Sequence, residues 1–150
     1  MTRMPESTPP LKRIGHVYRT FARLADSELR DLGFAMSQLP VLIALKKGEA
    51  LTQAELARIA KVEQPSMAQL LNRMERDGLV RRAPAPDDKR IRVISLTAHA
   101  NRLLPKAKAM MDALSDEALR GFSAADVKML DTLISRIAGN LARAAGERAE

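Results

Sequence analysis

The sequence predicts a mainly α-helical fold in which a pair of short helices is followed directly by a two-stranded β-hairpin. Three observations predict it. Aromatic residues make up only 3% of the 150 residues, so the core must be built from aliphatic side chains and methionine, which favours helices packed on helices. Two short helical segments occupy residues 52–77. Two β-prone runs, LVRR and RIRVISL, then flank the proline-containing segment APAPDDK.

The N-terminal part is expected to hold a flexible lead over residues 1–10, which contain three prolines, and then one long helix. Apolar residues at helical spacing predict that this helix runs from about residue 11 to residue 31, before Gly33: Ile14, Val17, Phe21 and Leu24.

The next helix, LPVLIALKK, is nearly apolar and is therefore expected at the centre of the core. Ser37 is the expected N-cap, and Pro40 falls in the first turn, where its missing N–H costs little. Lys46 and Lys47 suit the C-terminal end, and Gly48 is the expected stop.

Two helices then form a helix-turn-helix candidate. Thr52 and Glu55 have the spacing of a capping box, in which each side chain satisfies a free N–H of the other residue. That helix is expected to end near Ala60. A second one is expected from about Pro65 to residue 77, where Gly78 is the natural stop.

The second helix of the pair has two distinct faces on a helical wheel. Met67, Leu71 and Met74 form a core face. The other face holds side chains that can contact base edges or phosphates, namely Ser66, Gln69, Leu70 and Arg73, with Leu70 suited to a thymine methyl. The alternative is a solvated face with one exposed leucine.

The C-terminal part is expected to form two more helices. The first runs from Thr97 to about Gly121, with Pro105 a candidate kink, and Ser123 with Asp126 caps the second. The second carries apolar residues alternately three and four apart, which is the spacing of a heptad seam. About three turns of helix are expected beyond the cap, and so short a helix needs a partner.

Charge and composition narrow the class of function. The net charge of +7 favours a polyanionic partner, either nucleic acid or an anionic membrane surface. The absence of cysteine excludes disulfides and thiol redox sensing, and two isolated histidines do not favour a metal site. No catalytic triplet or phosphate-binding loop is visible, so we expect neither an enzyme nor a cofactor. Because no apolar run or signal peptide is present, we expect a cytoplasmic protein without membrane contact.

The segment EQPSMAQLLNRMERDGLVRR, followed by DDKRIRVISLT, resembles the MarR family of bacterial transcription regulators, and more closely its SlyA branch. Asp88, Arg90, Leu96 and Thr97 stand at the family's Asp-x-Arg and Leu-Thr positions in the hairpin. The resemblance covers residues 11–145. It implies a winged helix-turn-helix of about six helices and a two-stranded β-wing, in a homodimer that binds a pseudo-palindromic double-stranded DNA operator and is expected to act as a repressor.

The resemblance also implies roles for residues. Arg90 is expected to enter the minor groove, and Asp88 is expected to fix it, while Arg81 and Arg82 are expected to be phosphate contacts or solvated charges. The full set expected at the DNA is Thr52, Gln53, Gln64, Pro65, Ser66, Gln69, Leu70, Arg73, Asp88, Lys89, Arg90 and Arg92. The alternative is a winged helix that makes only protein contacts. Such a protein would not need Arg90 at the tip of its hairpin.

The terminal helices are expected to make the dimer, since a chain of this size has too little core to cover them. The expected interface comprises Leu11, Ile14, Tyr18, Phe21, Val127, Leu130, Ile134, Ile137 and Leu141. Residues 11–35 and 97–150 would form this dimerisation region, and residues 36–96 the DNA-binding lobe. The resemblance further implies a small aromatic carboxylate or phenol as effector, near Arg19 and Ser37.

Overall fold

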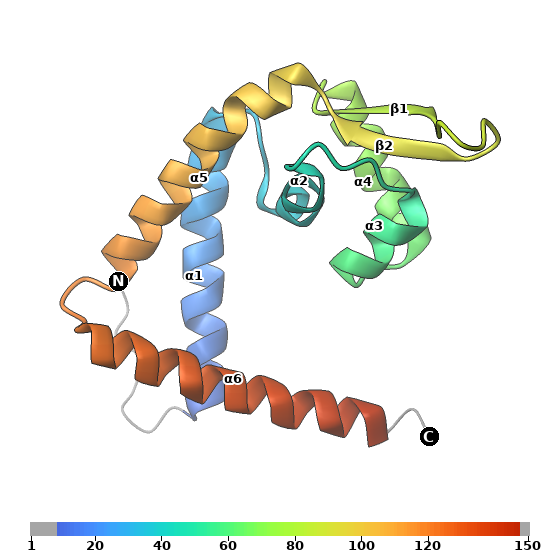
Figure 1. Cartoon of the computed structure of the whole chain (residues 1–150). Coiled ribbons are helices and arrows are strands. Elements are labelled where there is room, and N and C mark those ends of the chain that lie inside the picture. Colours follow the sequence, from blue (N-terminus) through green and yellow to red (C-terminus); the bar gives the residue numbers. More distant parts are fainter. Residues whose placement is uncertain (1–8, 148–150) are drawn as a thin grey trace. The chain divides into compact units, whose positions relative to one another are not determined.

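The computed structural model describes residues 9–147, with the side chain of Glu147 left out, so most of the expected N-terminal lead lies outside the described residues. Within these residues, six helices, a short 3₁₀ turn and one two-stranded sheet confirm the mainly helical winged fold (Figure 1). The elements are α1 (Pro10–Asp31), η1 (Met36–Gln38), α2 (Leu39–Leu45), α3 (Gln53–Ala60), α4 (Gln64–Arg76), β1 (Val80–Pro84), β2 (Arg92–Leu96), α5 (Ala98–Ala118) and α6 (Ala124–Glu147). The chain divides into two compact units, Met1–Met111 and Asp112–Glu150.

The hydrophobic core of the first unit gathers side chains from α1 to the start of α5. Its largest fully buried members include Leu29, Leu42, Leu56, Met67 and Ile94, which come from five different elements. Gln38 is the buried polar residue of the described part, and its Oε1 accepts a hydrogen bond from the backbone N–H of Ala35 at 2.9 Å. An apolar core that leaves no buried side-chain polar atom without a partner within residues 9–147 holds the helix pair and the hairpin as one lobe.

The hairpin pairs β1 and β2 in antiparallel register, with Val80 opposite Leu96 and Pro84 opposite Arg92. Leu51, in the loop before α3, adds an isolated bridge to Ile94 through two backbone hydrogen bonds of 3.0 and 2.7 Å. A two-stranded hairpin is marginally stable by itself. The buried side chains of Val80, Ile94 and Leu96 anchor this one in the core.

The capping predictions are confirmed at two helices and wrong at one. The Thr52 hydroxyl accepts from the Glu55 N–H at 3.2 Å, while Glu55 accepts from the Thr52 N–H at 2.7 Å. Ser123 and Asp126 make the same reciprocal pair. Ser37, by contrast, does not cap α2.

Ser37 lies inside the 3₁₀ turn that precedes α2, and α2 itself has no side-chain cap. The Gln38 side chain instead accepts from the Ala35 N–H at the start of the 3₁₀ turn. The start of this turn is also held from α1, because Asp26 Oδ1 accepts from the Met36 N–H at 3.0 Å. Pro40 occupies the first turn of α2, as expected. A sequence pattern could not reveal this arrangement, since the acceptor on Asp26 is ten residues away.

α6 is longer than the sequence analysis expected. It spans 24 residues and continues through Ala144, Ala145 and Gly146 to Glu147. Alanine and glycine at this end are compatible with a helix, because alanine is the best helix former and one glycine costs only about 1 kcal/mol.

Candidate nucleic-acid interface

Helix α4 presents a polar face to solvent. Glu63 precedes it with extended backbone, and Pro65 lies in its first turn, where no N–H is needed. Met67, Leu71 and Met74 are fully buried, which confirms the expected core face. The predicted contact residues Gln64, Pro65, Ser66, Gln69 and Arg73 are all exposed. The helix therefore offers hydroxyl, amide and guanidinium groups on one accessible surface.

Leu70 was predicted on that exposed face, and this placement is wrong. Its side chain is 9% exposed and belongs to the hydrophobic core. The physical reason is helical spacing: position 70 is three residues after Met67 and four before Met74, so it borders the stripe that these residues form. Leu70 contributes to the packing of α4 rather than to a surface for thymine methyl groups.

Thr52 and Gln53 stand at the start of α3. The Thr52 hydroxyl both accepts from the Glu55 backbone and donates to Glu55 Oε2 at 3.1 Å, so its hydrogen-bonding capacity is largely used within the cap. Hydrogen bonds from the Thr52 backbone and then its side chain lower the pKa of the Glu55 carboxyl. Gln53 is half-buried at the first position of the helix.

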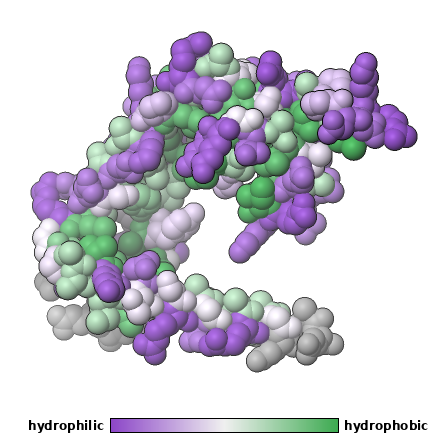
Figure 2. Space-filling view, in the orientation of Figure 1, coloured by the Kyte–Doolittle hydropathy of each residue, from purple (hydrophilic) through white to green (hydrophobic). Residues whose placement is uncertain are grey.

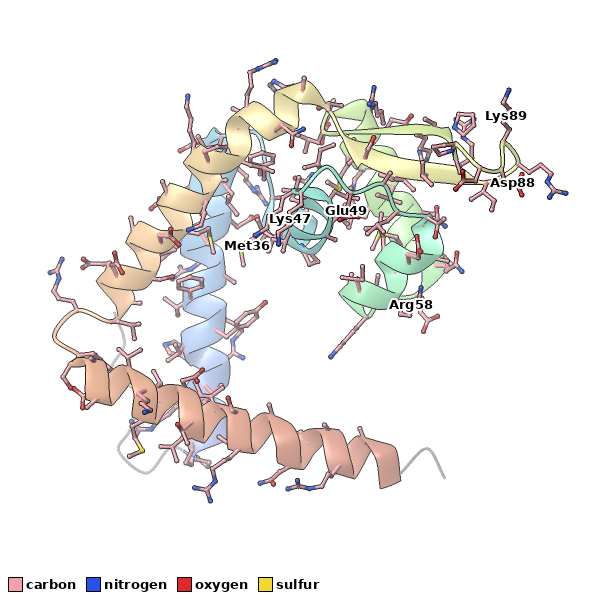
Figure 3. All side chains as sticks on the ribbon, in the orientation of Figure 1. Met36, Lys47, Glu49, Arg58, Asp88 and Lys89 are labelled. Atoms are coloured by element: carbon pink, nitrogen blue, oxygen red, sulfur yellow. The ribbon has the colours of Figure 1, made fainter. Side chains whose placement is uncertain are left out.

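The tip of the hairpin carries an arginine held by an aspartate. Asp88 Oδ1 accepts from both the backbone N–H and the Nε of Arg90 at 3.0 Å, and Asp88 Oδ2 accepts from a terminal nitrogen at 2.9 Å. The Arg90 side chain is 90% exposed, while that of Asp88 is 32% exposed. Figure 3 shows Asp88 and Lys89 at the outer end of the hairpin. The carboxylate thus fixes the guanidinium and leaves its outer edge open.

The electrostatics of this pair follow from its geometry. Side-chain and then backbone hydrogen bonds from Arg90 lower the pKa of the Asp88 carboxyl. The same carboxylate raises the pKa of the Arg90 guanidinium. Both groups therefore stay charged throughout the neutral range, and the pair is intact wherever the Asp88 carboxyl is ionised.

Two cations at the base of the wing have partners inside the protein. Arg81 Nε donates to Ser95 Oγ across the strands at 3.2 Å. One terminal nitrogen of Arg82 donates a hydrogen bond to Asn72 Oδ1 at 2.9 Å, and the other donates to Glu75 Oε2; both acceptors are on α4. The expectation of a solvated charge is wrong for Arg82, whose side chain is 21% exposed and paired with α4. Lys89 and Arg92 are exposed, as expected, and hydrophilic side chains cover the outer end of the hairpin (Figure 2).

Thr97 is a structural residue whose function the sequence analysis did not define. Its hydroxyl donates to the Gly78 carbonyl at 2.6 Å and accepts from the Ala100 N–H at 3.1 Å. The Thr97 backbone N–H also donates to the Leu79 carbonyl at 3.1 Å. One residue therefore caps α5 and ties it to the turn after α4. A threonine three residues before the first buried position of α5, Ala100, is the signal that could have predicted this cap.

Exposed apolar side chains follow the two terminal helices. On α1 these include Leu11, Ile14 and Tyr18, with Phe21 half-buried. On α6 they include Val127, Leu130, Ile134 and Leu141, with Ile137 half-buried. Large exposed apolar stripes are unusual on a soluble monomer and mark contact surfaces.

A cavity of about 590 Å³ lies between α2 and the first part of α5. Its wall is mainly apolar, with Leu42, Ile43 and Leu104 among the lining residues, and three lysines, Lys46, Lys47 and Lys108, contribute cationic groups. Neither Arg19 nor Ser37 lines it, and both are exposed. Figure 3 shows Lys47 and Met36 near α2.

Comparison with known proteins shows what this lobe is similar to. Residues 31–91 match the MarR family. The chain is 23% identical over 133 residues to an uncharacterized HTH-type transcriptional regulator, YybA of Bacillus subtilis, with 89% of each chain covered.

Solved structures share the fold over most of the chain. The transcriptional regulator SlyA matches with a TM-score of 0.78 and 22% identity, over 91% of this chain and 96% of SlyA. A mutant MarR from E. coli, solved in complex with operator DNA, matches with a TM-score of 0.74 and 26% identity, over 85% of this chain and 93% of that one. YybA and SlyA, two of these relatives, are described as transcriptional regulators.

Other kinds of site are not found in the part of the chain that the structure describes. No helix within residues 9–147 is long and apolar enough to cross a membrane. The same residues bring together no group of three or more histidine, cysteine or acidic side chains that could hold a metal ion.

Proposed function

We propose that this chain is a MarR-type DNA-binding transcription regulator that inserts α4 into the major groove and the hairpin tip into the minor groove. The observation that carries the proposal is the Asp88–Arg90 pair: an almost fully exposed guanidinium held by three hydrogen bonds at the outer end of a hairpin. A narrow minor groove concentrates negative potential and favours arginine. The E. coli MarR complex with operator DNA supports the same partner.

The direct test of this proposal is a salt titration. Binding to a duplex of about 30 base pairs, long enough for two half-sites one helical turn apart, is measured at several salt concentrations. We expect log K to fall steeply with log salt, and Arg90→Ala to weaken binding and reduce the slope by about 1. Arg136→Ala, an exposed arginine on α6, is the control and should change little. If Arg90→Ala binds DNA as tightly as wild type, the result favours the alternative of a winged helix that makes only protein contacts.

We assign recognition of the operator base sequence to the exposed face of α4. Gln69→Ala and Arg73→Ala should each change the preference among operator bases by about 1–3 kcal/mol if the side chains make bidentate base contacts. Equal losses on operator and random DNA would instead mean that these residues contact only phosphates. A footprint upstream of the chain's own gene would supply the operator.

We propose that the active form is a homodimer made by the exposed apolar faces of α1 and α6. Burying them against a second copy would remove large apolar stripes from water and set two α4 helices against one pseudo-palindrome. Leu130→Glu with Ile134→Glu places two charges in the proposed interface and should give a monomer in sedimentation equilibrium, with DNA affinity lost. Unchanged dimer mass would refute this interface.

The cavity between α2 and α5 is the proposed site of a small effector. Apolar walls suit an aromatic ring, and the ammonium groups of Lys46 and Lys47 suit a carboxylate. Calorimetry with salicylate tests it: Lys46→Ala with Lys47→Ala should abolish the heat, whereas Arg19→Ala should abolish it only if the effector lies near Arg19 and Ser37. No heat with wild type at millimolar salicylate would exclude this compound.

We further propose that the chain represses transcription from its operator. A reporter placed behind the operator should fall in output when the chain is expressed and recover with the effector. The SlyA-like branch is also still a prediction, because MarR and SlyA match the chain equally, with TM-scores of 0.77 and 0.78 and 22% identity each.

A further inference from the structure

We propose that Arg82 is a positioning residue that sets the angle between helix α4 and the hairpin, and so allows both to engage one DNA duplex. The contact consists of Arg82 on β1 and the two α4 residues Asn72 and Glu75, and we call it the Arg82 brace. The inference rests on the proposed DNA-binding function and assigns a residue that would never touch the DNA.

The brace is built from a planar, forked group and two acceptors one helical turn apart. Asn72 and Glu75 are three residues apart on α4 and therefore lie on the same face of the helix. One terminal nitrogen of Arg82 reaches Asn72 Oδ1 at 2.9 Å, and the other reaches Glu75 Oε2. Only arginine presents two donors in such a fixed fork, so lysine cannot replace it at both acceptors.

The backbone between α4 and β1 offers a natural place for the hairpin to pivot. Only residues 77–79 separate the two elements, and Gly78 among them has a φ of 72°. Backbone hydrogen bonds hold this turn, from Leu79 N–H to the Met74 carbonyl at 2.8 Å and from Gly78 N–H to the Glu75 carbonyl at 3.0 Å. These bonds fix the turn, and the buried side chains of Val80, Ile94 and Leu96 anchor the inner face of the hairpin. The Arg82 brace adds a polar tie farther along β1.

In the described part of the chain, the Arg82 brace supplies the side-chain hydrogen bonds that join α4 to the hairpin. Arg82 is the third residue of β1 and lies opposite Ile94 in the sheet. From there it reaches back to the last two turns of α4. A tie at this point restrains the whole strand, and with it the Asp88–Arg90 tip, relative to the exposed face of α4.

The Arg82 brace predicts that removing a negative charge from α4 lowers the affinity for DNA, which is opposite to the usual effect. Removing a negative charge from a DNA-binding surface ordinarily strengthens binding, because repulsion of the phosphates falls. Glu75→Gln removes such a charge but also weakens the hold on Arg82. If the brace positions the hairpin, Glu75→Gln weakens DNA binding instead, by about fivefold, which corresponds to about 1 kcal/mol.

The matched control is Asp77→Asn, which removes the same charge from the end of the same helix. Asp77 is exposed, and its contacts in the structure are backbone ones. Asp77→Asn should leave affinity unchanged or raise it. Arg82→Lys is the second variant: it keeps the charge and the fold, and should weaken binding about as much as Glu75→Gln. The pair Arg82→Lys with Glu75→Gln should lose no more than either alone.

The experiment uses the full chain and a labelled duplex of random sequence of about 30 base pairs, at low salt, with thermal midpoints measured for every variant. Weaker binding by Glu75→Gln and Arg82→Lys, beside unchanged or stronger binding by Asp77→Asn and similar thermal midpoints, supports the brace. Stronger binding by Glu75→Gln, matching Asp77→Asn, overturns the inference alone. If the wild-type chain binds no duplex at low salt, the proposed function itself fails.

Discussion

Leu70 and Gln69 are neighbours on α4 that should respond to alanine in opposite ways. Leu70 is 9% exposed and packs in the core, whereas Gln69 is exposed. Truncating a buried leucine costs about 2–5 kcal/mol, and the low end applies here because the side chain lies at the edge of the core. We expect Leu70→Ala to lower the free energy of unfolding by about 2–3 kcal/mol.

That loss of stability can be measured as a lower melting temperature. A chain of this size shifts by about 2–4 °C for each kcal/mol, so Leu70→Ala should melt about 4–12 °C below wild type by circular dichroism. Gln69→Ala should melt within about 1–2 °C of wild type, since alanine is the better helix former and no core contact is lost. DNA binding, measured well below both midpoints, should be affected mainly by Gln69→Ala. A Leu70→Ala variant with wild-type stability and lost affinity would refute the burial of this side chain.

Three further outcomes are expected. Thr97→Val should lower the free energy of unfolding by about 1–2 kcal/mol in urea denaturation, because it removes the cap of α5 and the hydroxyl tie to Gly78; an unchanged midpoint would show the tie to be dispensable. Gly78→Ala should destabilise by about 1–2 kcal/mol because of the positive φ, whereas Gly139→Ala within α6 should be neutral or stabilising, and equal effects would contradict the strain argument. Glu55 has a pKa below its ordinary value when folded, so its cap contributes above the unfolded pKa and is lost as the pH falls through the folded pKa. Glu55→Gln should therefore be less stable than wild type at neutral pH, and the difference should vanish in strong acid; a difference independent of pH would mean that the carboxylate charge is irrelevant.

Local sequence signals predicted local structure well in this chain. The Thr52–Glu55 and Ser123–Asp126 caps need only residues three apart, and both form as expected. The proline-bounded hairpin and the core face of α4 also follow from short-range patterns. Each of these features is decided by neighbours within one helical turn or one strand, which the printed sequence displays directly.

Two of the errors arose where distant residues decide the outcome. Gln38 and Asp26 together organise the start of α2, and the second lies ten residues from its partner. Arg82 looked like any other wing cation, because nothing in its own stretch reveals that Asn72 and Glu75 face it. Leu70 could have been placed correctly from the wheel alone, had the width of the apolar stripe been taken into account.

Internal pairing changes how the basic character of this chain acts on a polyanion. Arg82 forms an ion pair with Glu75, and Arg30 and Arg120 pair with Asp26 and Glu117. Each pair is neutral as a whole, so these three arginines contribute little to the electrostatic potential far from the protein. The formal charge of +7 already counts such pairs as neutral, so long-range attraction toward DNA comes from the excess cations, which include Lys89 and Arg92 at the hairpin. Discrimination between one duplex and another would depend more on shape and placement than on total charge.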